Sequence, residues 1–334
     1  MMYKHTCFED FQAGQSGITG PRSVGEAEIV AFASITGDYN FLHVTTHEAA
    51  KTFYGGRIAH GLLGCSMAVG MLSLDAPHTI GRNVPDSYLS GFRINYRAAL
   101  KSGDTVRVEW QIGQCHDNDA SVNYGTVETT FRVITQNGDA IYDGAFLLNV
   151  KRRGASDAAI YDTSAQTLWQ PREVAWDENS LFTIDDYVVG AGGITCGRTI
   201  SEADVVNFAG LTADQSPIYV DEVFASKTRF GGRIVPAMFV FDLSLGFWAR
   251  DGWITRVKTD KGAQDIGHLG DNARFLKPVR IGDTVRCIYM IKDVRSSKSN
   301  PNRRIVTYGF QVINQRDEVV QDGEVLVIKG DVGR

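Results

Sequence analysis

A carboxylate, an amide and an imidazole stand close together in the segment TGDYNFLH, which begins at Thr36. Asp38 and His43 could take up and deliver protons as a general acid/base pair, with the Asn40 amide to orient them. The spacing alone does not show that these side chains converge. An isolated pattern of this kind is more often a capping aspartate and a partly buried histidine that bonds to the backbone, so both interpretations stay open at this point.

The same segment occurs twice in the chain, but the histidine occurs once. Residues 23–58 align without a gap with residues 199–234, and both stretches end in GGRI. The second copy reads TADQSPIY, so Asp214 is present and Tyr219 takes the place of the histidine. Internal repetition predicts two similar structural units. We therefore expect one active site per chain, in the first unit, with the second unit as a degenerate scaffold.

Each copy predicts a short helix at its start. Ser23 with Glu26, and Thr199 with Glu202, have the S/T-x-x-E spacing of a capping box, in which two side chains satisfy free amides at a helix N-terminus. We expect a helix directly after each pair. The TGDYNFLH segment would then form a loop at the end of the first of these helices.

A long buried helix and several strands follow in each copy. The runs 58–74 and 234–248 are apolar on nearly all sides, which indicates core helices. Segments rich in β-forming residues come next, separated by Gly-Asp turns: Thr105–Ile112, Val122–Ile134, Ala140–Val150, Thr284–Val294, Arg304–Ile313 and Glu318–Ile328. A curved antiparallel sheet wrapped around a central helix buries such a helix economically, so the predicted fold class is α+β with two tandem units.

Length and composition bound the domain organisation. A chain of 334 residues with an ordinary apolar fraction favours two hydrophobic cores. We place the first unit at 1–151 and the second at 182–334, joined by a polar, weakly periodic linker over 152–181. The apolar run at 58–74 is better explained as a buried helix than as a membrane span.

Charge and cysteine usage exclude several classes of function. The net charge of −5, without a long basic run, gives no electrostatic footprint for nucleic acid. The five cysteines are scattered and never form CxxC, which argues against a disulfide framework and a zinc site. The first residues lack the features of a secretory signal, so we expect a cytoplasmic protein with a small-molecule partner, no metal and no membrane association.

The segment FASITGDYNFLHVTTHEAAKTFYGGRIAHGLL, residues 32–63, resembles the signature of the MaoC-like hydratases, also called the (R)-specific enoyl-CoA hydratase or hydratase 2 group. That signature runs T/S-G-D-x-N-P-x-H, followed about a dozen residues later by F-G-x-x-I-A-H-G. Phe41 stands where the family usually has proline, a difference that bears on the exact loop shape but removes no chemical group. The resemblance extends over both halves and includes the GDTV turns.

The resemblance implies a double hot-dog fold and a set of site residues. The catalytic dyad carries over to Asp38 and His43, the supporting asparagine to Asn40, and the amide that holds the thioester oxygen to Gly61. His60, next to that glycine, has no direct catalytic role in this assignment. In the second unit, Pro236 and Ala237 replace the His-Gly pair.

The activity implied is reversible hydration of a 2-enoyl-CoA to an (R)-3-hydroxyacyl-CoA. Negative charge develops on the thioester oxygen in this reaction, and an amide at a helix N-terminus meets that charge without reorganising. No cofactor is needed, because CoA is part of the substrate. The acyl group, the roles of the two dyad residues and a homo-oligomeric state are left open.

Basic side chains could bind the phosphates of CoA, although a solvated role is as plausible for each. The candidates are Arg57, Arg93, Arg274 and Lys277, with Arg97, Arg233 and Arg280 beside them. Two other functions compete with hydration: a hot-dog thioesterase, because one fold hosts several reactions, and a non-catalytic acyl-CoA binder, because the second copy tolerates loss of the dyad.

Overall fold

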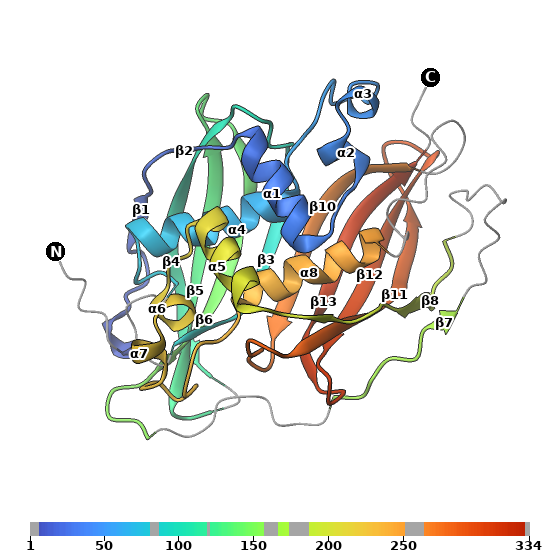
Figure 1. Cartoon of the computed structure of the whole chain (residues 1–334). Coiled ribbons are helices and arrows are strands. Elements are labelled where there is room, and N and C mark those ends of the chain that lie inside the picture. Colours follow the sequence, from blue (N-terminus) through green and yellow to red (C-terminus); the bar gives the residue numbers. More distant parts are fainter. Residues whose placement is uncertain are drawn as a thin grey trace.

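One sheet runs through both halves of the chain in the computed structural model (Figure 1). The structure describes residues 7–80, 87–118, 121–156, 166–173, 187–250 and 264–330. Within these residues the sheet has thirteen strands, in the order β1-β4-β5-β6-β3-β10-β13-β12-β11-β8-β7, with β2 beside β4 and β9 beside β11. The order of the second half mirrors that of the first, as an internal repeat requires.

The strands of the first half are β1 (Ser16–Ile18), β2 (Arg22–Ser23), β3 (Tyr88–Tyr96), β4 (Thr105–Asp117), β5 (Tyr124–Thr135) and β6 (Ala140–Lys151). Those of the second half are β7 (Arg172–Glu173), β8 (Ala191–Ile194), β9 (Arg198–Thr199), β10 (Gln264–Phe275), β11 (Thr284–Ser296), β12 (Arg303–Ile313) and β13 (Val319–Gly330). All pair antiparallel except β7 with β8. The six predicted strands are confirmed.

The two halves are joined edge to edge by β3 and β10, strands that the sequence patterns did not predict. They pair antiparallel, with Gly91 opposite Arg274 and Asn95 opposite Gly270. A Cβ atom on Gly91 would lie 2.6 Å from the Ala273 carbonyl oxygen, so the close approach of the strands requires glycine there. The join turns two curved sheets into one.

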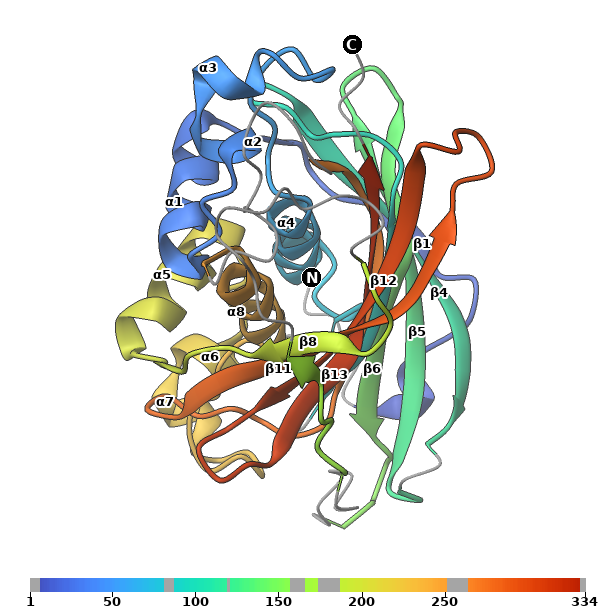
Figure 2. The same cartoon turned by 90° about the vertical axis from the view of Figure 1, so that its right-hand side faces the viewer.

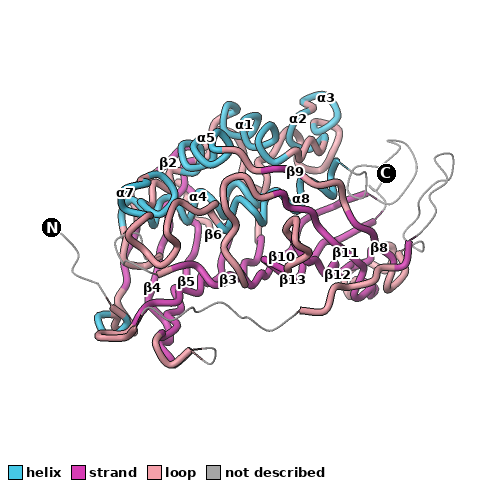
Figure 3. The backbone as a smooth tube through the Cα atoms, turned by 60° about the horizontal axis from the view of Figure 1, so that its bottom comes forward, coloured by secondary structure: helices cyan, strands magenta, loops and turns pink. Residues whose placement is uncertain are grey.

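The helices gather on one side of this sheet (Figures 2 and 3). They are α1 (Glu26–Thr36), α2 (Phe41–Val44), α3 (Thr46–Ala49), α4 (Gly61–Asp75), α5 (Glu202–Thr212), α6 (Pro217–Val220), α7 (Glu222–Ala225) and α8 (Ala237–Arg250), whereas the short 3₁₀ helix η1 (Phe8–Asp10) lies apart from them against β5. Helices α4 and α8 are buried along nearly their whole length. Each half is thus a helix wrapped by a curved sheet, and the predicted double hot-dog architecture is confirmed.

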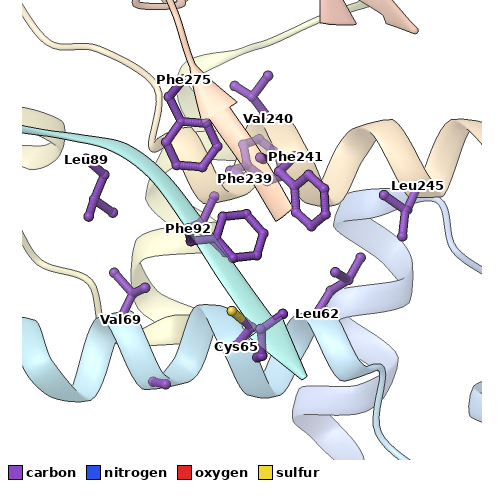
Figure 4. Close-up of a cluster of buried hydrophobic side chains, with 14 of the residues drawn as sticks. Leu62, Cys65, Val69, Leu89, Phe92, Phe239, Val240, Phe241, Leu245 and Phe275 are labelled. Carbon is purple, nitrogen blue, oxygen red and sulfur yellow. The ribbon is translucent and has the colours of Figure 1, made fainter. Parts of the chain in front are cut away.

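The hydrophobic cores of the two halves are continuous, rather than the two separate cores that length suggested. A single cluster of buried side chains draws on both halves. At its centre Phe92 of β3 lies between Phe241 of α8, at 5.0 Å between ring centroids, and Phe275 of β10, at 5.9 Å (Figure 4). The strands that join the sheets also join the cores.

The predicted capping boxes are wrong by two residues. Ser23 and Thr199 lie in β2 and β9, where their hydroxyl groups pair at 2.7 Å with Thr105 and Thr284 respectively. In the first copy Gly25 caps α1 instead, and its amide donates to Glu28. The helices begin where expected, but each starts from a neighbouring cap.

Residues 166–173 of the expected linker pack against the second half. Leu168 and Trp169 join a small apolar cluster with Ile288 of β11, and the Trp169 amide donates to Gln311 at 2.9 Å. Residues 152–156 of the range are also described, whereas 157–165 and 174–181 lie outside the described residues. In the ranges that the structure describes, no helix combines the length and apolarity that crossing a bilayer requires.

Candidate active site

The loop after α1 holds the predicted catalytic residues in fixed positions. Gly37 ends the helix at φ +85°, a left-handed conformation that favours glycine. The Asp38 amide donates to Thr36 Oγ1 at 3.3 Å, and the Asn40 amide donates to Asp38 Oδ1 at 3.1 Å. Asn40 Oδ1 accepts from the amide at the start of α2, the short helix that carries His43. Asn40 therefore orients both ends of the dyad.

Asp38, His43 and His60 converge on one point. One side-chain donor atom from each lies within 4.8 Å of the others, and all three residues are buried. The two imidazole rings stack, with centroids 3.7 Å apart. The structure thus brings the proposed dyad together and adds His60, which is the residue preceding α4.

Hydrogen bonds fix the orientation of both imidazoles. His43 Nδ1 lies 2.9 Å from the Ile58 carbonyl oxygen, so the neutral ring carries its proton there and leaves Nε2 as an acceptor. His60 Nε2 lies 3.0 Å from the Asp38 carbonyl oxygen. His60 therefore supports the backbone of the loop at Asp38, a positioning role that its sequence neighbourhood did not reveal.

Burial keeps both imidazoles neutral near pH 7. The pKa of His43 lies below 6.5 because burial disfavours the charged ring, and the nearby Asp38 carboxylate opposes this only in part. The pKa of His60 is depressed further, by burial and by the adjacent His43. A neutral His43 can accept a proton from a bound water molecule.

A cavity of about 670 Å³ opens beside these groups. Its lining includes the dyad, Asn40 and Gly61 from the first half, and Trp248 and His268 from the second half. Gly61 is the first residue of α4, and within the described ranges no group accepts a hydrogen bond from its amide. Asp38, His43 and a helix N-terminus thus line one cavity.

In the corresponding loop of the second half, the polar side chains form hydrogen bonds to other side chains of the protein. Ser216 donates to Asp214 Oδ1 at 2.6 Å, and its oxygen also lies 3.2 Å from Ser73 Oγ. Burial raises the pKa of Tyr219, which has replaced the histidine. Neither Asp214 nor Tyr219 lines the cavity. This arrangement agrees with the expectation of a single site per chain.

Each loop also rests on the central helix of the opposite half. A Cβ atom on Gly246 of α8 would lie 2.0 Å from the Thr36 carbonyl oxygen and 3.4 Å from the Asp38 nitrogen. A Cβ atom on Gly70 of α4 would lie 1.8 Å from the Thr212 carbonyl oxygen. The second half therefore helps to position the loop of Asp38 in the first half.

The four basic residues predicted for the CoA phosphates each pair with an acid. Arg57 pairs with Glu26, Arg93 with Glu128, Arg274 with Asp322, and Lys277 with Glu318. None of the four lines the cavity, whereas Arg97 and Lys101 do. Their contact with CoA stays a prediction, and Lys101, which the sequence patterns missed, is better placed for it.

The cluster of Asp38, His43 and His60 also has the composition of a metal site. Two imidazoles and a carboxylate within a few ångströms are ligands that Zn²⁺ and similar ions accept. However, His43 Nδ1 and His60 Nε2 face carbonyl oxygens, so only the other nitrogen of each ring could coordinate an ion. The absence of a metal from the active enzyme stays a prediction.

Comparison with known proteins agrees with the geometry. The model of a family described as MaoC like domain matches residues 10–136 and 194–312. The 3-hydroxybutyryl-CoA dehydratase of Methylorubrum extorquens is 33% identical over 107 residues, or 32% of this chain and 64% of that protein. The (R)-specific enoyl-CoA hydratase of Rhodospirillum rubrum is 31% identical over 152 residues, or 46% of this chain and 94% of that protein. Of protein MaoC from Klebsiella aerogenes, the chain spans 25%.

Solved structures share the fold over the whole chain. A MaoC domain protein of Chloroflexus aurantiacus superposes with a TM-score of 0.76 and 18% identity, covering 99% of both chains. A Mycobacterium tuberculosis protein described as a double hot dog gives 0.73 and 16% identity, covering 97% of this chain and 98% of the other. At these identities the similarity concerns the fold alone.

Proposed function

Because the chain belongs to the MaoC-like domain family, we propose that it catalyses the reversible addition of water to a 2-enoyl-CoA, giving an (R)-3-hydroxyacyl-CoA. The observation that carries this proposal is the convergence of Asp38 and His43 beside the Gly61 amide in one cavity. Relatives of this chain named as a 3-hydroxybutyryl-CoA dehydratase and an (R)-specific enoyl-CoA hydratase support it.

In the proposed mechanism, Asp38 and His43 hold one water molecule against the double bond. His43 Nε2 accepts a proton as the water oxygen attacks C3, because the ring is neutral and its Nδ1 proton is held by Ile58. The imidazolium then gives that proton to C2 on the same face, so that the elements of water are added across the bond and His43 is neutral again. Asp38 orients the water and stabilises the imidazolium that forms.

The Gly61 amide would receive the charge of the enolate. During attack, negative charge moves to the thioester oxygen, and the N-terminus of α4 carries partial positive charge. Loss of one such donor typically costs about 2.7 to 4 kcal/mol of activation free energy. A substrate bound this way extends its CoA past Lys101 and Arg97, and no metal or redox cofactor takes part.

The experiment that tests this function follows crotonyl-CoA with two readouts. Hydration removes the absorbance of the conjugated thioester and releases no thiol. A thioesterase would release free CoA, which a thiol reagent detects, and a pure acyl-CoA binder would change neither signal. Loss of absorbance without thiol is the expected result, and release of thiol at the same rate would contradict it.

The configuration of the product and the acyl range follow from the same assay. Dehydration of (R)- and (S)-3-hydroxybutyryl-CoA, measured separately, should proceed with the (R) form alone. Hydration rates over a series of chain lengths and branches would define the acyl group. We also propose the cytoplasm as the compartment, which cell fractionation would test.

A further inference from the structure

The second half supplies a polar network to the cavity, on the strand that joins the two sheets. His268 and Asp271 of β10 face each other, with His268 Nε2 at 2.5 Å from Asp271 Oδ1. Tyr96 of β3 donates its hydroxyl hydrogen to the other oxygen, Asp271 Oδ2, at 2.7 Å. The Asp271 side chain is fully buried. Both oxygens of the carboxylate are therefore engaged, and the imidazole is held in one orientation.

The polar residues of this network occupy positions at which the first copy of the repeat has apolar core residues. When the copies are aligned on Gly103 and Gly282 of their Gly-Asp-Thr turns, His268 corresponds to Leu89 and Asp271 to Phe92. Both strands have a bulge at this same place, between Leu89 and Gly91 and between His268 and Gly270, which supports the alignment. Leu89 and Phe92 belong to the hydrophobic core. Burying a carboxylate where the sister strand buries hydrocarbon is costly, and residues that break a local rule in this way are typical of functional sites.

The network lies beside the catalytic groups. The Tyr96 ring packs against Gly61, so closely that a Cβ atom there would lie 2.8 Å from Tyr96 Cε1. The rings of Tyr96 and His268 have centroids 4.6 Å apart. His268 lines the cavity with its side chain 24% exposed. His43, Gly61 and His268 thus surround the same part of the cavity.

We propose that His268 is a further catalytic residue, whose Nδ1–H donates a hydrogen bond to the thioester oxygen beside the Gly61 amide. This rests on the proposed hydratase function and deepens it. With Nε2 directed at Asp271, Nδ1 is the only ring nitrogen that can face the cavity. Nδ1 carries a hydrogen when the His268–Asp271 pair holds two protons: one lies on Nδ1, and the other lies between Nε2 and the Asp271 carboxylate. Two donors then meet the oxygen on which the enolate charge develops.

In this proposal the second half, which lacks the Asp/His dyad, also contributes to the reaction. The first half supplies the groups that handle water, and the second half supplies one of the two groups that polarise the thioester. Asp271 and Tyr96 are positioning residues in this scheme, because Tyr96 holds Asp271 and Asp271 holds the imidazole. A substrate bound across both halves explains why the pair sits on β10, at the seam of the two sheets.

The test compares His268→Leu, which installs the residue of the first copy, with His268→Gln, which keeps an N–H donor. With crotonyl-CoA we expect His268→Leu to lower kcat by about a hundredfold with little change in KM, because the bond strengthens only in the transition state. His268→Gln should recover a large part of that loss. Circular dichroism and thermal unfolding of both variants show whether they fold.

A second readout does not depend on turnover. Acetoacetyl-CoA binds as a mimic of the enolate, and donors at its thioester oxygen increase the enolate form, which has its own ultraviolet band. Wild-type protein and His268→Gln should increase this band, whereas His268→Leu should not. Because no hydration is needed, the band separates failure of this inference from failure of the hydratase proposal.

Three results would overturn the inference. The first is a folded His268→Leu protein with wild-type kcat and enolate band. The second is a higher KM at unchanged kcat, which would mean that His268 binds the substrate and the transition state equally strongly. The third is an equal loss in His268→Leu and His268→Gln with the enolate band retained in both, which would assign the defect to packing.

Discussion

Ser66 Oγ donates a hydrogen bond to Asp242 Oδ2 at 2.7 Å and thereby links the two central helices, α4 and α8. Each residue lies eight positions after the isoleucine of its GGRI segment, so the bond joins equivalent positions of the repeat. Asp242 is completely buried, and burial raises the pKa of its carboxyl well above 3.8. The centre of the molecule therefore holds a carboxylic acid that stays protonated where surface aspartates are charged.

Stability should depend on pH through Asp242. Between 3.8 and its raised pKa, the folded protein binds a proton that the unfolded chain has lost, so the free energy of unfolding falls as pH rises. Asp242→Asn removes this titration. We expect the stability of Asp242→Asn relative to wild type to increase from about pH 4 to about pH 8 in urea denaturation. A difference that does not vary with pH would show that Asp242 is not protonated by burial.

Substitution of the dyad should abolish most activity without unfolding the protein. Asp38→Asn or His43→Ala should lower kcat for crotonyl-CoA by about a hundredfold or more, the usual scale for a positioned acid or base. Asp214→Asn and Tyr219→Phe change the equivalent positions of the second half and serve as matched controls, with activity close to wild type. If Asp214→Asn removed activity and Asp38→Asn did not, the active half would be the second one.

The activity of the wild-type protein should decrease as the pH is lowered below 6.5. Burial lowers the pKa of His43, and Asp38 raises it again in part, so the imidazole stays neutral to below pH 6.5. The base form is lost only as pH falls through that lowered pKa. A profile of kcat/KM against pH should therefore show an acid limb with its midpoint below 6.5. A midpoint clearly above this value would contradict a neutral, buried His43 as the base.

Local patterns predicted that a loop carrying Asp38 and Asn40 follows the first helix, because the hydrogen bonds of this loop join residues a few positions apart. The Asp38 and Asn40 contacts span two residues each, and the repeat supplied a second copy for comparison. The predicted capping boxes lie two residues too early, because Ser23 and Thr199 belong to strands β2 and β9. Their hydroxyl groups bond to Thr105 and Thr284, some eighty residues away. A capping motif cannot show such competition from a distant strand.

The seam between the halves could not be predicted from the sequence. The burial pattern of β3 is interrupted by a bulge after Leu89, which breaks the alternation that marks a strand. Tyr96 and Asp271 are 175 residues apart and meet only because β3 pairs with β10. The polar network with His268 was missed for the same reason: no spacing in the chain relates its members.

Removal of metal ions should leave activity unchanged. The cluster of Asp38, His43 and His60 could accept a divalent cation, but the proposed reaction uses it to hold water. Protein dialysed against EDTA should hydrate crotonyl-CoA at the wild-type rate, and added Zn²⁺ should slow the reaction by occupying the water position. Loss of activity on dialysis, with recovery on addition of one metal, would instead make the site a metal centre.

The glycines on the two central helices offer a matched pair of substitutions. Gly246→Ala would place a methyl group 2.0 Å from the Thr36 carbonyl oxygen and displace the loop that carries Asp38. Gly70→Ala would make the equivalent clash with Thr212, in the loop without a histidine. Both variants overpack a tight contact, so each should lose about 1 to 3 kcal/mol in free energy of unfolding, measured in urea.

Activity should separate the two glycine variants, although stability does not. A displacement of about 1 Å in a catalytic group can cost about a hundredfold in rate, so Gly246→Ala should lose activity on that scale while it remains folded. Gly70→Ala should retain most of its activity, because the loop it disturbs holds no proposed catalytic group. Both are assayed with crotonyl-CoA well below their unfolding temperatures. Equal losses of kcat in the two variants would mean that the contact between Gly246 and the first loop does not set the geometry of the site.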